Sequence, residues 1–144
     1  MQSAKEDMNG FKEMLETKGL KCTHERKCIF DEVQRIGAHF DADKLYERFK
    51  ERGERISRAT VYRTLPLLLE AGVVQKSAGD GKQDFFEKTG KKGHHDHMVC
   101  LTCGKIIEFR NETIEREQDD ISKKHQFKIA FHDHRIFGYC SKCR

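Results

Sequence analysis

The chain has 144 residues and a formal net charge of +4, with basic and acidic side chains nearly balanced. This length suits one ordinary domain or two small ones, and no apolar run approaches the roughly 18–20 residues that cross a membrane. The N-terminal segment is charged and lacks the apolar core of a secretion signal, so we expect a cytoplasmic protein without a membrane partner. Because the charge is mild, any contact with nucleic acid must depend on locally placed Lys and Arg.

Four amphipathic segments in the first half are predicted to be helices. Thr23, Asp41 and Ser57 are suited to cap the last three of them, and a glycine follows the first, third and fourth. The predicted helices span residues 7–18, 23–37, 41–52 and 57–70.

A change of period after Gly72 predicts a β-hairpin. The apolar pairs Val73-Val74 and Phe85-Phe86 flank a turn-rich stretch at residues 77–82. Helices followed by one hairpin are typical of a winged helix-turn-helix, which we place at residues 1–88.

The second half is predicted to be a small α/β domain at residues 94–144, after a flexible linker at 89–93. The whole chain therefore has a predicted α+β fold in two domains. The elements expected in the second domain are strands at 97–101 and 105–109, a helix at 111–125 and a last strand at about 127–139.

Two CxxC pairs predict a structural zinc site. Each pair, Cys100 with Cys103 and Cys140 with Cys143, places two sulfurs on one ion from a tight turn, and together they complete a closed tetrahedral Zn²⁺ site. The alternative is that one pair is redox-active or idle. Cys22 and Cys28 lie on or beside a helix without sharing a face, and we expect free thiols there.

A run of four potential ligands, His94-His95-Asp96-His97, lies directly before the first CxxC pair. Alternate side chains of a strand point to opposite faces, so His95 and His97 share one face and His94 and Asp96 the other. One strand can thus supply two metal sites that suit Fe²⁺, Mn²⁺, Co²⁺ or Zn²⁺. The alternatives are a solvated histidine tract and, with less support because no separate base or nucleophile is evident, a metal-dependent hydrolase.

The helix that begins after Ser57 carries a candidate DNA-reading face. Its apolar residues fall on one side, while Thr60 and Arg63 lie roughly opposite and Tyr62 lies on the flank. Arg63 is suited to contact guanine or phosphate, Tyr62 a thymine methyl and Thr60 a phosphate. We place Arg58 with them and expect Lys21 to reach the minor groove or the backbone. A merely solvated helix face is the alternative.

These motifs together resemble the ferric uptake regulator (Fur) family. Residues 57–65 followed by 70–74 are similar to its recognition helix and the start of its wing. Residues 94–109 resemble its metal signature, and residues 19–23 resemble its start. The match runs in order over about residues 11–143.

The resemblance implies a homodimer in which residues 94–144 form a metal-binding dimerisation domain, and it leaves open whether two dimers pair into a tetramer. It implies a regulatory site made of His39, Glu87, His95, His97 and Glu108. It also implies a second site made of His94, Asp96, Glu115 and His132. The remaining histidines match no ligand position and are expected at the surface: His24, His125 and His134.

The function implied is a metal-dependent repressor, not an enzyme, that binds an AT-rich inverted repeat and controls iron-uptake genes. By resemblance, glutamates at 87 and 108 fit an iron sensor better than the family's peroxide sensors, which carry aspartates there, so Fe²⁺ is the expected regulatory ion, with Mn²⁺, Co²⁺ or Zn²⁺ as substitutes. A zinc- or manganese-responsive regulator of the same family is an alternative. A zinc-ribbon module that contacts a protein partner is another, from a different class.

Overall fold

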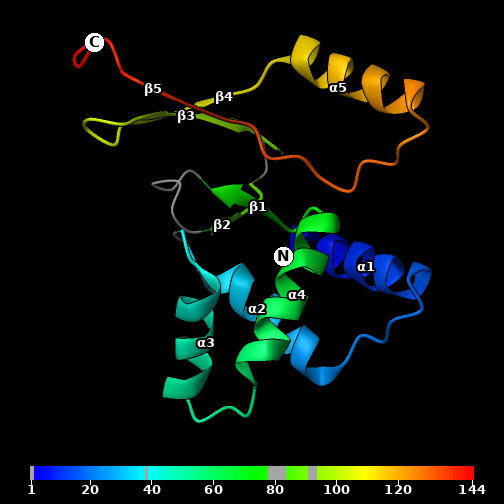
Figure 1. Cartoon of the computed structure of the whole chain (residues 1–144). Helices are drawn as coiled ribbons and strands as arrows, with labels where there is room; N and C mark the ends of the chain where they lie inside the picture. The colour runs from blue at the N-terminus through cyan, green and yellow to red at the C-terminus, as the bar shows by residue number, and fades with distance from the viewer. Residues whose placement is uncertain (1, 38, 78–83, 91–93) are drawn as a thin grey trace.

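The computed structural model describes residues 2–37, 39–77, 84–90 and 94–144 (Figure 1). Four helices and a two-stranded hairpin form the first half, as the sequence predicted. Their bounds are α1 (Gln2–Thr17), α2 (His24–Arg35), α3 (Ala42–Glu51), α4 (Arg58–Glu70), β1 (Val74–Ser77) and β2 (Phe85–Lys88).

The predicted caps of α2, α3 and α4 are confirmed. Thr23, Asp41 and Ser57 each accept a hydrogen bond from the backbone amide three residues later, at 3.3, 2.7 and 3.1 Å. Each bond satisfies one amide that the first helical turn leaves without a partner. Gly72 follows α4 with a φ of +73°, a conformation that glycine adopts without strain.

The core of the first half lies among the four helices and the hairpin. Phe11 of α1 stacks on Phe30 of α2, with ring centroids 5.9 Å apart. Val61, Leu65 and Leu68 of α4 are buried, which leaves the opposite side of that helix facing solvent. Burying such apolar surface is the main stabilising contribution to this half.

The hairpin pairs with the segment that joins α2 to α3. β1 and β2 pair antiparallel, so that Gln75 lies opposite Glu87. Phe40 and Phe86 exchange backbone hydrogen bonds of 2.9 and 2.7 Å, which places His39 beside β2. The hairpin is confirmed. Most of its expected turn at 77–82, and positions 91–93 of the expected linker, lie outside the described residues.

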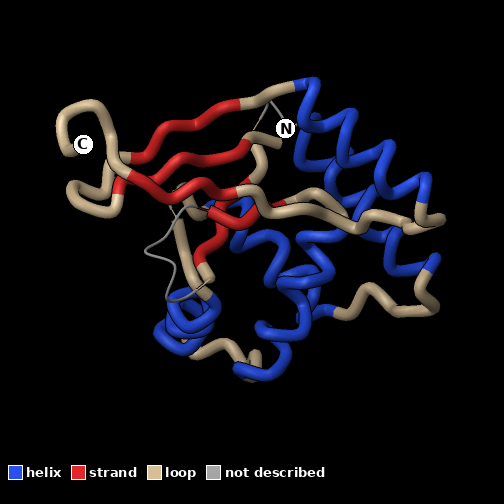
Figure 2. The backbone as a smooth tube through the Cα atoms, turned by 45° about the horizontal axis from the view of Figure 1, so that its top comes forward, coloured by secondary structure: helices blue, strands red, loops and turns tan. Residues whose placement is uncertain are grey.

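The second half is a three-stranded sheet with one helix (Figure 2). β3 lies in the centre and pairs antiparallel with β4 and parallel with β5. The strands are β3 (Asp96–Cys100), β4 (Ile106–Phe109) and β5 (Arg135–Gly138), with α5 (Glu112–Lys124) between β4 and β5.

The predicted strand at 127–139 is too long. Only Arg135–Gly138 pairs with β3, and residues 127–134 form no strand. The alternation of Phe127, Ile129 and Phe131 misled the prediction, because a strand also needs a neighbouring strand to receive its backbone hydrogen bonds. This segment instead crosses from the end of α5 back to the sheet (Figure 1).

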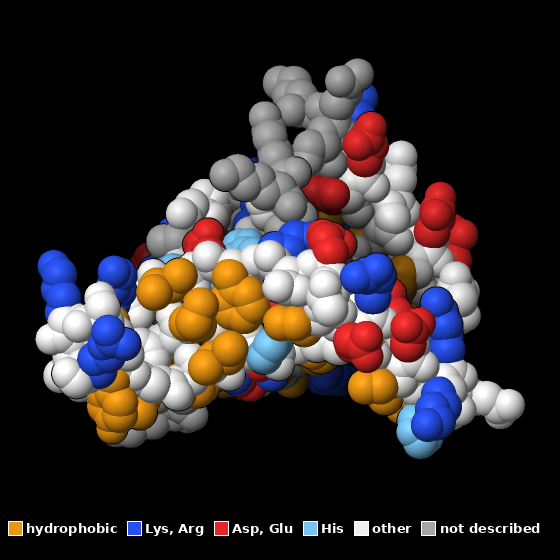
Figure 3. All heavy atoms as spheres, turned by 90° about the horizontal axis from the view of Figure 1, so that it is seen from above, with side chains coloured by type: hydrophobic (Ala, Val, Ile, Leu, Met, Phe, Trp, Pro, Cys, Tyr) orange, Lys and Arg blue, Asp and Glu red, His pale blue; other side chains and the backbone are white. Residues whose placement is uncertain are grey.

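Apolar side chains of the second half remain largely exposed. Met98, Ile107 and Ile136 lie on the three strands at 37%, 41% and 44% exposure, and Figure 3 shows apolar side chains gathered on this side of the molecule. Within the described residues, α5 has no buried side chain. None of the described helices is long and apolar enough to cross a membrane.

Candidate metal centres and nucleic-acid interface

The four cysteines of the two CxxC pairs meet at one end of the sheet. Cys100 ends β3, and Cys140 follows β5 closely, so the parallel pairing of these strands joins the two motifs. All four sulfurs lie within 4.8 Å of one another, and the sulfurs of Cys103 and Cys140 are 3.7 Å apart. Sulfurs at the corners of a tetrahedral zinc site, with Zn–S near 2.3 Å, lie about 3.8 Å apart. A disulfide would need about 2.05 Å.

Neighbouring groups make these thiols unequal. Backbone amides of Cys103 and Cys140 lower the pKa of Cys100 to about 6, because they donate hydrogen bonds to its sulfur. Hydrogen bonds with the Cys140 thiol and loss of hydration raise the pKa of Cys143 to about 12. Four thiolates so close together require a cation, so the set fits a thiophilic ion such as zinc.

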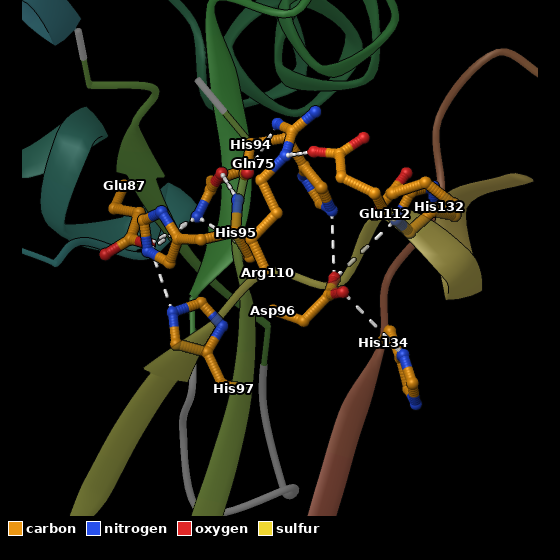
Figure 4. Close-up of polar contacts among 11 residues, drawn as sticks. Gln75, Glu87, His94, His95, Asp96, His97, Arg110, Glu112, His132 and His134 are labelled. Atoms are coloured by element: carbon orange, nitrogen blue, oxygen red, sulfur yellow. Dashed lines mark hydrogen bonds and ion pairs between the residues drawn. The ribbon is translucent and has the colours of Figure 1, made fainter. Parts of the chain in front are cut away.

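β3 and the residues before it separate two further clusters, as the strand alternation predicted. Figure 4 shows His95 and His97 turned to one side with Glu87, and Asp96 turned to the other side with His94 and His132. Each set has ligand atoms within 4.8 Å of one another. The two clusters therefore draw on alternate residues of the same run.

Glu87 lies at the centre of the cluster that we call the regulatory cluster: His39, Glu87, His95, His97 and Glu108. Its Oε1 is 3.0 Å from Nε2 of His95 and 3.3 Å from Nε2 of His97, and its Oε2 is 3.2 Å from Nδ1 of His39. His95 is also 3.6 Å from Glu108. The structure thus brings Glu87, His95 and His97 to one point and places His39 and Glu108 beside it.

The environment of Glu87 favours its charged form. Burial opposes ionisation, but the adjacent His97 and Gln75 side chains favour it by more, so the pKa of Glu87 lies below its ordinary value. His97 is 2% exposed, and its Nε2 faces Oε1 of Glu87 at 3.3 Å. A carboxylate facing a buried imidazole nitrogen fits a cation between them.

The second cluster consists of His94, Asp96, Glu115 and His132. Oδ1 of Asp96 is 2.9 Å from His94 and 3.6 Å from His132, which is 3.4 Å from Glu115. The ligand atoms of Glu115 and His132 are buried without hydrogen-bond partners in the described chain. All four residues belong to the second half.

Sequence reasoning missed His134. It was expected at the surface, but its Nδ1 is buried and lies 3.8 Å from Oδ2 of Asp96. His134 directly precedes β5, the strand next to β3. The parallel register of β3 and β5 produces this approach, and spacing within one segment does not reveal it. His125 is exposed as expected, and His24 lies 3.5 Å from the Cys28 sulfur.

The expected DNA-reading residues of α4 lie on its solvent side. Tyr62 is 50% exposed, and its hydroxyl donates a 3.1 Å hydrogen bond to Asp43 of α3. Arg58 forms a 2.8 Å ion pair with the same carboxylate and lies over the Tyr46 ring. Both side chains therefore have partners on α3 that a nucleic acid would have to replace or share.

A polar pocket lies beside the start of α4. Thr60 lines it and contacts the Ser57 hydroxyl at 2.8 Å, while Arg63 lines it from the next turn. Arg26 and Arg55, which the sequence reading did not single out, also line it, together with one acidic residue, Glu25. Lys21 is exposed, and its carbonyl accepts a hydrogen bond from Arg26. Three guanidinium groups beside a helix N-terminus suit a phosphate backbone.

Comparison with known proteins accounts for the occurrence of metal-ligand clusters and a candidate DNA-binding helix in one chain. Residues 17–137 match the model of the ferric uptake regulator family. The chain belongs to this family. It is 41% identical over 135 residues to the ferric uptake regulation protein of Campylobacter upsaliensis, covering 92% of this chain and 86% of that one. It is also 41% identical to the Yersinia pestis protein over 133 residues, covering 90% and 89%.

Solved structures of Fur proteins share the architecture. The Helicobacter pylori regulator, described as having three functional metal-binding sites, matches with a TM-score of 0.61 at 28% identity over 97% of this chain and 93% of that one. The Pseudomonas aeruginosa regulator with manganese matches with a TM-score of 0.60 at 33% identity, covering 88% and 95%. The resemblance and the α+β fold are thus confirmed.

The family assignment settles the class of protein. The chain is a Fur-family transcription regulator with metal-binding sites, and not an enzyme. The hydrolase alternative is therefore removed, and so is the alternative of a zinc-ribbon module that contacts a protein partner.

Proposed function

We propose that this Fur-family regulator is a repressor that binds double-stranded DNA as a homodimer and responds to Fe²⁺ at iron-uptake genes. Residues 1–88 would form the DNA-binding domain, 89–93 a hinge and 94–144 the dimerisation domain. The observation that carries this proposal is the composition of the regulatory cluster. His39 and Glu87 precede the hinge, whereas His95, His97 and Glu108 follow it.

The spacing of the regulatory cluster fits a divalent cation. Four contacts between ligand atoms of the cluster measure 3.0 to 3.6 Å, three of them made by Glu87. Ligand atoms about 2.1 Å from one ion are separated by about 3.0 Å in an octahedron and 3.4 Å in a tetrahedron. A bound cation would supply attraction to both halves at once. Without it, Glu87 and the histidines keep only hydrogen bonds and ion-pair contacts across the hinge.

The energy required is within reach of such a site. Raising the fraction of protein in the DNA-binding arrangement from about 1% to about 99% requires the ion to favour that arrangement by about 5.5 kcal/mol. Several ligand bonds shared by two domains are sufficient for that. Once the hinge is fixed, two α4 helices of a dimer would meet an AT-rich inverted repeat about one turn of DNA apart.

Exposed apolar surface supports the homodimer. The strands carry Met98, Ile107 and Ile136 on the surface, and Ile121 of α5 is 59% exposed. A small domain with so few buried apolar side chains needs a partner to cover this face. The four cysteines would hold a structural Zn²⁺ that ties residues 140–143 to the end of β3.

Ligand chemistry alone does not select iron. Imidazole and carboxylate ligands bind Fe²⁺, Mn²⁺, Co²⁺ and Zn²⁺, and intrinsic affinity ranks Zn²⁺ above Fe²⁺. Iron is proposed because several relatives are named ferric uptake regulators. A manganese- or zinc-responsive regulator is the alternative, and a DNA-binding assay at matched free concentrations of each ion distinguishes them.

The test is an anaerobic titration of Fe²⁺ or Mn²⁺ into the zinc-containing full chain, with binding to an AT-rich inverted repeat followed by fluorescence anisotropy. Wild-type protein should gain affinity with metal, whereas the double variant His95→Ala, His97→Ala should not. His125→Ala removes an exposed histidine and is the matched control, which should behave as wild type. Equal DNA affinity with and without metal in wild type would refute the proposed switch.

A further inference from the structure

We infer that Gln75 positions the regulatory cluster, holding Glu87 and His95 ready for the cation and linking the wing to the start of β3. The inference rests on the proposed function of that cluster. Gln75 lies on β1 in the DNA-binding half, and His95 lies just after the hinge. The Gln75 side chain therefore bridges the same two halves as the proposed ion.

The hairpin register fixes the first of these contacts. Gln75 and Glu87 are directly opposite in the antiparallel pair, so their side chains share one face of the hairpin. Nε2 of Gln75 donates a 2.7 Å hydrogen bond to Oε1 of Glu87. Gln75 is only 5% exposed, so water does not compete effectively for this bond.

The Gln75 side chain makes its second set of contacts with the main chain of His95. The His95 amide donates to Oε1 of Gln75 at 3.4 Å, and Nε2 of Gln75 lies 3.5 Å from the His95 carbonyl oxygen. Turning the amide over would place its oxygen against the Glu87 carboxylate and its NH₂ against the His95 amide. The hydrogen-bond network therefore allows only one orientation of this side chain.

The Gln75 amide also lies against the His95 ring. Nε2 of Gln75 is 3.0 Å from Nε2 of His95, which also faces Glu87 at 3.0 Å. An NH₂ group can only donate, so without an ion this contact uses the Nε2 lone pair of His95. An ion at Nε2 would take over that lone pair, and Gln75 would then position His95 through its main-chain contacts and Glu87 through the 2.7 Å hydrogen bond.

Residues that orient metal ligands in this way change metal affinity without touching the ion. Losing such a partner typically weakens metal binding by about 10–100-fold. Gln75→Met keeps the length and apolar body of the side chain and removes all of its hydrogen bonds. Gln34 provides a matched control, because it lines a pocket with His39 and Glu87 and its amide has no hydrogen-bond partner among the described residues.

The experiment measures Co²⁺ affinity by chelator competition, together with the visible absorption of the bound ion. His132→Ala is introduced in every protein so that the second cluster does not contribute. Gln75→Met should bind Co²⁺ about 10–100-fold more weakly with an altered spectrum, whereas Gln34→Met should match its parent. Zinc content should stay the same in all proteins. If Gln75→Met does not fold, Gln75→Ala replaces it.

Two results would overturn the inference. One is wild-type Co²⁺ affinity and spectrum in Gln75→Met. The other is an equal loss of affinity at the second cluster, measured in a His97→Ala background, because that would indicate general loosening. The proposed function fails separately: it is refuted if His97→Ala leaves metal-dependent DNA binding unchanged, whatever Gln75→Met does.

Discussion

Glu32 offers a test of how the first half of the chain is held together. Its carboxylate is fully buried on α2, yet three arginines approach it. Arg52 donates a 2.7 Å hydrogen bond, Arg48 donates another, and Arg35 lies 3.5 Å away. Arg48 and Arg52 come from α3 and the residue after it, so this buried charge joins the first two helices of the candidate DNA-binding motif.

We expect Glu32→Gln to lower the free energy of unfolding by about 2–3 kcal/mol. Hydrogen bonds to charged groups contribute about 1.5–3 kcal/mol each, and the substitution weakens two of them. The sum is discounted because Arg48 and Arg52 are 42% and 38% exposed and regain water when the carboxylate is removed. Because glutamine has nearly the same volume as glutamate, the packing should not change, and the loss of unfolding free energy should reflect the removed charge.

The assay is urea unfolding followed by far-ultraviolet circular dichroism, with Glu54→Gln as the control. Glu54 forms a 2.9 Å pair with Arg52 but is 38% exposed, so its loss should cost less than about 1 kcal/mol. Equal effects of the two substitutions at neutral pH would refute the reasoning.

The dependence on pH supplies a second check on Glu32. Burial raises the pKa of its carboxyl, but hydrogen bonds from Arg52 and Arg48 lower it by more, to below the ordinary 4.5. A depressed pKa stabilises the fold fully above the value of the unfolded chain, and the contribution disappears as pH falls through the folded value. The difference between wild type and Glu32→Gln should therefore shrink in acid. Comparing the two cancels the effects of metal release that they share.

Three further outcomes follow from the sites. Cys103→Ser should abolish stable zinc binding and loosen the second half, and retention of one zinc per chain against a chelator would contradict the assignment. Arg63→Ala should weaken DNA binding, and the slope of log affinity against log salt should fall by about one if Arg63 contacts phosphate. Ile107→Lys, on the exposed apolar strand face, should convert dimer to monomer in analytical ultracentrifugation, and an unchanged mass would exclude this face as the interface.

Local sequence signals predicted most of the fold. The caps Thr23, Asp41 and Ser57 bind backbone amides in the first turn of their own helices, so they can be predicted from the sequence without knowledge of tertiary contacts. The alternation of residues 94–97 likewise follows from the period of an extended chain, and the structure places its members in two clusters as expected.

Contacts that depend on how strands pair could not be predicted from local sequence signals. Gln75 joins the regulatory cluster because the hairpin register places it opposite Glu87, and His134 approaches Asp96 because β5 runs parallel to β3. Neither register is fixed by a spacing along the chain, since a shift of one residue would turn each side chain to the other face. The predicted strand at 127–139 was too long for a related reason, because alternation was counted without a pairing partner.

The three clusters differ in what they can control, although all use β3 or the residues directly before it. The cysteine set and the second cluster take every side chain from residues 94–144, so an ion in either one can stabilise that half but cannot by itself constrain the wing. Only the regulatory cluster includes Glu87 and His39, which the Phe40–Phe86 bridge holds beside the hairpin. A ligand changes an equilibrium only by its differential affinity for the two states. In the proposed function, a metal ion would therefore control the DNA-binding geometry through Glu87 and His39, and ions in the other two clusters would stabilise the second half.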